Sequence, residues 1–79
     1  MAHAQRIAEL VLGIHRRNGG QLPSLDFSLP LLDRSLGLDS LDLAEIMAAV
    51  EKEFGQSPFD SGEPPRTWGD VVDLLDRSS

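Results

Sequence analysis

The sequence predicts an all-α protein, a small antiparallel bundle of three to four helices with a long first loop. Apolar residues recur with the 3.6-residue period of an α-helix in three separate stretches. The long connection between the first two stretches holds only one short alternating segment, which has no partner strand. Three amphipathic helices in a chain of 79 residues must bury their apolar stripes against one another. Residues 1–79 are therefore expected to form one domain.

The first helix is predicted over residues 4–17. Arg16 and Arg17 at its end suit the negative pole of the helix dipole, and Asn18 with the glycines at 19–20 stops it. His3 and His15 lie far apart in the sequence, with no carboxylates or thiols arranged to complete a metal site, so we expect both to be solvated. The apolar stripe of this helix consists of Ile7, Leu10, Val11 and Ile14.

The connection over residues 19–35 contains two prolines but holds too many apolar residues for a free linker. We expect a loop laid across the bundle with its apolar side chains in the core, and a short helical turn near residues 31–34. The apolar residues of this loop are Leu22, Leu25, Phe27, Leu29, Leu31 and Leu32.

A second helix is predicted with its N-cap at Asp39 or Ser40 and its end at Phe54. Asp39 can act as N-cap with Asp42 three residues later, which would leave the Ser40 hydroxyl free at the first helical position. Alternatively Ser40 itself caps the helix, because serine is among the best N-caps. A helix N-terminus also favours an anion, so the position permits a phosphodiester on Ser40. The buried stripe is Leu43, Ile46, Met47, Val50 and Phe54.

The segment over residues 55–66 holds three prolines, which allow at most one helical turn near residues 58–61. Thr67 then caps the last helix, with Asp70 completing a capping-box-like pair. Trp68 could pack at the rim of the bundle or be fully buried, since its ring carries a polar N–H. The stripe of this helix is Trp68, Val71, Val72 and Leu75.

Composition excludes several classes of function. The 13 acidic and 7 basic residues give a net charge of −6, which argues against nucleic acid and favours basic partners. Without cysteine the chain has no disulfide or thiolate metal site, so thiol chemistry must come from an added group. No apolar run approaches the roughly 20 residues that span a bilayer. The N-terminus lacks the pattern of a secretion signal, so a cytoplasmic protein is expected.

Residues 36–45, Leu-Gly-Leu-Asp-Ser-Leu-Asp-Leu-Ala-Glu, run into a helix that ends Glu-Lys-Glu-Phe-Gly at 51–55. Together with Thr-Trp-Gly-Asp-Val-Val at 67–72, they resemble the acyl carrier proteins. The resemblance covers nearly the whole chain, most loosely over residues 19–33 and 56–66. It implies that Ser40 is esterified by 4′-phosphopantetheine.

The resemblance also implies a mechanism. A phosphopantetheinyl transferase, using magnesium and coenzyme A, joins the Ser40 oxygen to the phosphate of the arm. The terminal thiol of the arm then carries acyl groups as thioesters and delivers them to biosynthetic enzymes of a fatty acid, polyketide or related pathway. The chain is therefore expected to be a carrier and not an enzyme, with no catalytic residues and no metal site.

The implied partners are the transferase and acyl-transferring and condensing enzymes with basic docking patches. We expect no nucleic acid partner and no membrane span, and a monomeric carrier. Weak, fast docking would use electrostatic complementarity more than tight binding. The expected contact face combines acidic with small apolar residues, namely Asp39, Leu41, Asp42, Ala44, Glu45, Ala48 and Glu51.

Two alternatives remain on sequence grounds. A peptidyl or aminoacyl carrier would use the same attachment chemistry with another cargo, although the acidic context of Ser40 favours acyl groups. An acidic helical adaptor would bind a protein through the same helix face with Ser40 unmodified. A gain in mass after incubation with coenzyme A and a transferase would separate the adaptor from both carriers.

Overall fold

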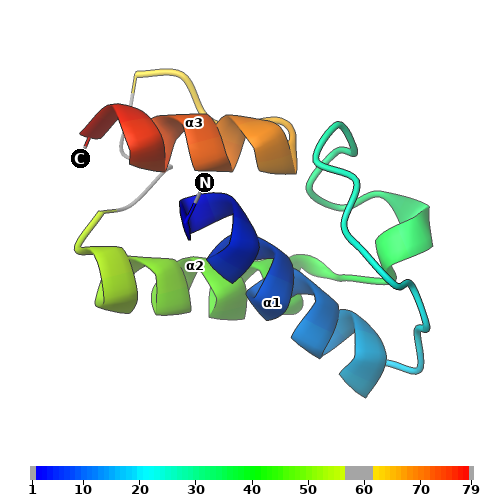
Figure 1. The fold of residues 1–79 in the computed structure, drawn as a ribbon. Coiled ribbons are helices and arrows are strands. Elements are labelled where there is room, and N and C mark those ends of the chain that lie inside the picture. The colour runs from blue at the N-terminus through cyan, green and yellow to red at the C-terminus, as the bar shows by residue number, and fades with distance from the viewer. Residues whose placement is uncertain (1, 57–61, 79) are drawn as a thin grey trace.

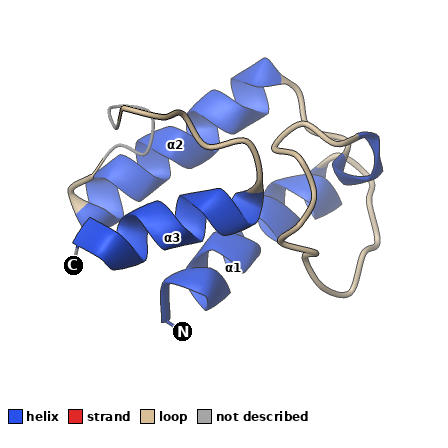
Figure 2. Ribbon diagram, turned by 90° about the horizontal axis from the view of Figure 1, so that it is seen from above, coloured by secondary structure: helices blue, strands red, loops and turns tan. Residues whose placement is uncertain are grey.

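A computed structural model of the protein describes residues 2–56 and 62–78. Its helices are α1 (Ala2–Arg17), α2 (Ser40–Phe54) and α3 (Trp68–Ser78), with a short 3₁₀ helix, η1 (Arg34–Leu36), in the first connection (Figure 1). α1 runs opposite to α2 and α3, which point the same way in both views (Figures 1 and 2). The predicted small helical bundle with a long first loop is confirmed. The helical turn considered near residues 58–61 lies outside the described residues.

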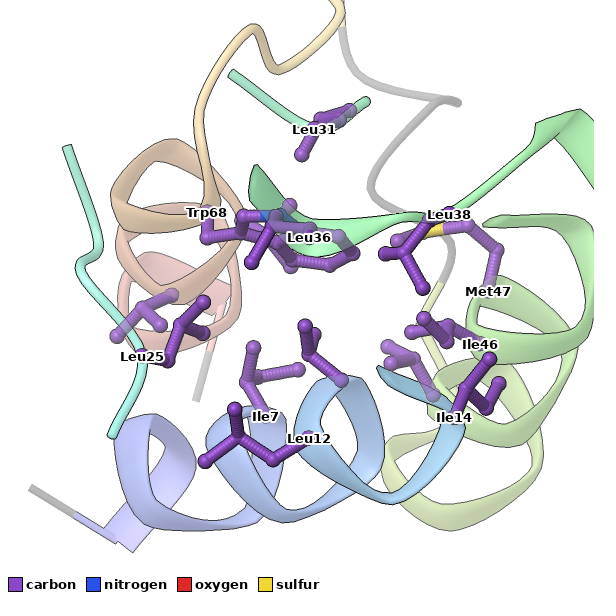
Figure 3. Close-up of a cluster of buried hydrophobic side chains, with 14 of the residues drawn as sticks. Ile7, Leu12, Ile14, Leu25, Leu31, Leu36, Leu38, Ile46, Met47 and Trp68 are labelled. Carbon is purple, nitrogen blue, oxygen red and sulfur yellow. The ribbon is translucent and has the colours of Figure 1, made fainter. Parts of the chain in front are cut away.

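The three apolar stripes meet in one core, shown in Figure 3. Leu10, Leu43 and Phe54 are only partly buried and pack against its edge. Leu12 lies outside the predicted stripe of α1 but is buried in the same cluster as Leu25 of the first loop. The buried residues of the predicted stripes are Ile7, Val11 and Ile14 of α1, Ile46, Met47 and Val50 of α2, and Trp68, Val71, Val72 and Leu75 of α3.

The first loop lies across the bundle, as predicted, and it also pairs with another segment of the chain. Its backbone meets the start of α3 through three hydrogen bonds: Leu31 N–H to the Arg66 carbonyl (3.1 Å), Trp68 N–H to the Leu29 carbonyl (3.3 Å) and Gly69 N–H to the Phe27 carbonyl (2.8 Å). An isolated antiparallel bridge forms at their centre. The alternating segment therefore has a partner, which the sequence did not reveal because that partner lies almost forty residues later in the chain.

Two other details of this loop differ from expectation. Leu32 is 46% exposed and does not fill the core. The helical turn lies at Arg34–Leu36, not at residues 31–34, because Asp33 accepts a hydrogen bond from the Ser35 N–H (3.1 Å) and caps it there. The core positions of the connection are taken instead by Leu25, Leu31, Leu36 and Leu38.

Trp68 is fully buried, which settles the choice between rim and core. The start of α3 agrees with prediction: Thr67 Oγ1 accepts from the Asp70 N–H, and Asp70 Oδ2 accepts from the Thr67 N–H, both at 3.1 Å. Among the described residues, the Trp68 indole N–H has no hydrogen-bond partner.

The prediction that both histidines are solvated is wrong. His15 is buried: its Nδ1 lies 2.7 Å from the Leu36 carbonyl oxygen, and its Nε2 accepts the Leu22 N–H at 3.1 Å. His3 is partly buried, bonded to Asp76 through Nδ1. Leu36 and Asp76 are distant in sequence from the histidines that they bond, so the spacing of the histidines gave no sign of these contacts.

Candidate functional site

Ser40 stands at the first helical position of α2. Asp39 is the N-cap, with extended backbone, and its Oδ1 accepts the Asp42 N–H at 2.8 Å. Asp42 Oδ2 accepts the Asp39 N–H in return at 3.3 Å, which completes a capping box. The alternative in which Ser40 caps the helix is therefore wrong. Ser40 is exposed, and no hydrogen bond occupies its hydroxyl in the part of the chain that the structure describes.

The loop before Ser40 is fixed by its two leucines and the glycine between them. Leu36 and Leu38 are both buried, so their side chains hold the loop against the core. Gly37 adopts a left-handed conformation (φ 63°, ψ 30°) that closes η1, and its N–H donates to the Arg34 carbonyl. The Leu-Gly-Leu sequence thus turns the chain between two buried anchors, and the next residues emerge at the surface.

The end of α1 holds this loop from the other side. Asn18 Nδ2 donates to the Gly37 carbonyl (3.1 Å) and to Asp42 Oδ2 (2.9 Å). His15 holds the adjacent Leu36 carbonyl. These two side chains therefore fix the entry to α2, and neither forms a hydrogen bond with Ser40. The sequence identified Asn18 only as part of a helix stop, and nothing local to it indicates a partner more than twenty residues away.

Asp42 is the most constrained acid of the site. It is partly buried and accepts from the Asn18 amide, the Asp39 N–H and Arg17 Nη2 (3.4 Å). These bonds, the Asn18 amide first, lower the pKa of the Asp42 carboxyl below its ordinary value of 3.8. Its carboxylate therefore stays charged at the positive end of α2, where the helix dipole also favours it.

The predicted contact face of α2 lies on one side of the helix and reaches the surface. Leu41, next to Ser40, is 78% exposed. Two of its acids are already engaged: Arg17 Nη1 donates to Glu45 Oε2 at 3.0 Å, and Arg17 Nη2 also reaches Asp42. The exposed members of the predicted set are Asp39, Leu41, Ala44, Glu45, Ala48 and Glu51; Asp42 is only partly exposed.

The described residues contain no group of three or more histidine, aspartate and glutamate side chains that could hold a metal ion. No helix in the described ranges is long and apolar enough to cross a membrane. One hollow of about 340 Å³ lies between α1 and the first loop, against Leu12, Leu25 and Phe27. Ser40 lines neither this hollow nor the one of about 620 Å³ between residues 62–66 and α3, and it is exposed at the tip of α2.

The chain matches the protein family described as "Phosphopantetheine attachment site" over residues 5–61. That range holds most of α1, the whole first loop, Ser40 and α2. No solved structure matches the chain significantly. Because the match extends over well more than half of the sequence, the chain belongs to the phosphopantetheine attachment-site family, whose members are carriers of a covalent 4′-phosphopantetheine group and not catalysts.

Proposed function

We propose that this protein is an acyl carrier protein and that Ser40 holds its 4′-phosphopantetheine. The observation that carries the proposal is the exposed Ser40 hydroxyl, left free because Asp39 and Asp42 cap α2 between themselves. A residue that must be reached by several enzymes in turn has to stand clear of the core. The family of the chain supports the same group, since its members carry 4′-phosphopantetheine covalently.

The attachment chemistry suits the tip of a helix. The Ser40 oxygen attacks the phosphorus of coenzyme A that bears the pantetheine arm, and the bond from that phosphorus to the adenosine bisphosphate breaks. The serine proton passes to a base of the transferase. The new phosphodiester keeps one negative charge, which lies beside the unpaired N–H groups and the positive dipole of α2. The fold thus favours the product electrostatically.

The arm ends in the only thiol of the loaded protein, because the chain has no cysteine. We propose that this thiol carries acyl intermediates of a fatty acid, polyketide or related pathway as thioesters. No second thiol on the chain competes for the cargo.

The exposed side of α2 is the proposed docking face for the transferase and for acyl-transferring and condensing enzymes. It combines acids with an exposed leucine and two exposed alanines. A basic patch on an enzyme would be attracted by the net charge of −6 and oriented by the acids nearest Ser40. Such contacts raise the association rate more than the affinity, which suits a carrier that must leave each enzyme quickly.

Incubation with coenzyme A, magnesium and a broad-specificity phosphopantetheinyl transferase tests the proposal. Intact mass spectrometry should show one added phosphopantetheine group on the wild type and none on Ser40→Ala. Ser35→Ala is a matched control, because Ser35 is also exposed but its hydroxyl donates to Asp33 Oδ2 at 2.6 Å. This control should be modified like the wild type. An unmodified wild type would exclude the carrier, and modification of Ser40→Ala would move the site elsewhere.

A further inference from the structure

Arg17 reaches across from the end of α1 to the proposed docking face. Its guanidinium donates two hydrogen bonds to the Glu45 carboxylate, Nη1 to Oε2 at 3.0 Å and Nη2 to Oε1 at 3.3 Å. The same Nη2 lies 3.4 Å from Asp42 Oδ1. This is the fork geometry in which arginine binds carboxylates most strongly. A positive charge of the carrier therefore already occupies the position that a basic partner would take.

The two acids held by Arg17 are not equivalent. The Asp42 carboxylate is held by Asn18 and by the capping box, so it cannot move to pair with a docking enzyme. Glu45 is one turn further along α2 and its side chain is 56% exposed. Within the described residues its only ion-pair partner is Arg17. Glu45 is therefore the acid for which Arg17 and a docking enzyme would compete.

We propose that Arg17 is an intramolecular competitor on the docking face: it occupies Glu45 in the free carrier, and the basic patch of the phosphopantetheinyl transferase must displace it to dock. This inference rests on the proposed function. The Arg17 side chain is itself 55% exposed, so it can leave Glu45 without opening the core. The contact between Arg17 and Glu45 lowers the effective negative charge near Ser40. If this contact is weakened, the transferase should therefore associate faster.

Arg6 also joins α1 to α2 but cannot have this role. Arg6 donates to Glu53 through Nε (2.8 Å) and Nη2, at the opposite end of α2 from Ser40. Arg6 and Arg17 thus join the two helices at both ends, but only Arg17 pairs with acids near the N-terminal end of α2, where Ser40 lies. Arg16, the neighbour of Arg17, is exposed and makes no ion pair with any described residue. It is therefore a matched control for charge without contact.

The experiment compares kcat/KM of the transferase for wild type, Arg17→Gln and Arg16→Gln at low ionic strength. Each variant removes one positive charge from a chain of net charge −6. We expect Arg17→Gln to raise kcat/KM by about 2- to 5-fold, as release of an exposed ion pair allows. Arg16→Gln should give a clearly smaller rise through long-range charge alone. The difference in kcat/KM between the two variants should become smaller at about 0.5 M salt, because surface ion pairs are screened there.

A second pair of variants ties the effect to Glu45. Glu45→Gln should lower kcat/KM, and in that background Arg17→Gln should give no more gain than Arg16→Gln. Circular dichroism should show the helical content of the wild type in each variant. Arg17→Lys keeps the charge but cannot form the two parallel hydrogen bonds, so it should raise kcat/KM less than Arg17→Gln does.

Three results would overturn the inference: equal effects of Arg17→Gln and Arg16→Gln, a fall in kcat/KM with Arg17→Gln, or no effect of Glu45→Gln. A fall would mean that Arg17 itself contacts the enzyme. These results are distinct from failure of the proposed function, in which the wild type would gain no mass at all.

Discussion

His15 Nδ1 lies 2.7 Å from the carbonyl oxygen of Leu36, and this contact joins the end of α1 to the loop that leads to Ser40. On the other side of the ring, Nε2 accepts the Leu22 N–H at 3.1 Å. A neutral imidazole with its hydrogen on Nδ1 makes both bonds, whereas an imidazolium has no acceptor for Leu22. The buried ring therefore acts as a neutral connector between three segments of the chain.

Replacement of His15 by alanine should destabilise the protein strongly. The Leu36 carbonyl and the Leu22 N–H would lose their partner, and unpaired buried polar groups cost about 1–3 kcal/mol each. We expect the free energy of unfolding, measured with urea, to fall by at least about 2 kcal/mol. ¹⁵N NMR of the wild-type ring should show hydrogen on Nδ1. A neutral ring with hydrogen on Nε2 would contradict the assignment of the two hydrogen bonds.

Gly20 and Gly13 should respond in opposite ways to alanine. A Cβ at Gly20 would lie 2.1 Å from ring atoms of His15, so Gly20→Ala must displace the ring and should lower stability by about 1–3 kcal/mol. Gly13 is exposed within α1 with nothing within 4 Å of a Cβ, so Gly13→Ala should raise stability by up to about 1 kcal/mol. Thermal melting of the two variants provides the comparison; a shift of both midpoints in one direction would contradict it.

The caps of α2 and α3 allow stability to be separated from function. Asp39→Ala and Thr67→Ala each remove an N-cap side chain of similar geometry, and each should lower the free energy of unfolding by about 0.5–2 kcal/mol. Only Asp39→Ala should also slow modification of Ser40, because only that cap leaves the serine hydroxyl free. Equal transferase rates for both variants would show that the cap does not prepare the serine.

Acid should destabilise the protein through its hydrogen-bonded carboxylates. The pKa of Asp42 is lowered chiefly by Asn18, that of Asp70 by the N–H groups of Arg66 and Thr67, and that of Glu53 by Arg6. A folded-state pKa below the ordinary value contributes stability at higher pH, which is lost as the pH falls through the folded value. Urea unfolding between about pH 5 and pH 2 should show this loss. The free energy of unfolding of Asp42→Asn should depend less on pH over the same range.

Local rules were sufficient for the helices and their caps. The periodicity of α1, α2 and α3 and the pairs Asp39–Asp42 and Thr67–Asp70 depend on residues three or four apart, which a sequence displays directly. The same rules located Ser40 at the first helical position once Asp39 was assigned as the cap.

Most contacts that the sequence did not reveal join distant segments, and the cap of η1 by Asp33 and Ser35 is a local exception. His15 and Leu36 are separated by 21 positions, and Arg17 and Glu45 by 28. The pairing of Phe27 and Leu29 with the start of α3 is longer still. No periodicity or motif encodes which solvent-facing residue of one helix will meet which residue of another, because that depends on the packing angle of the finished bundle. Arg17 was therefore assigned only to a helix end.

The burial of Trp68 has a practical consequence. It is the single tryptophan of a chain without tyrosine, and its side chain is fully excluded from solvent. Its fluorescence therefore reports one point, the packing of α3 in the core, and the emission should shift to longer wavelength when water reaches the indole. The protein contains its own optical probe of folding, so no label need be attached to the surface that its partners would use.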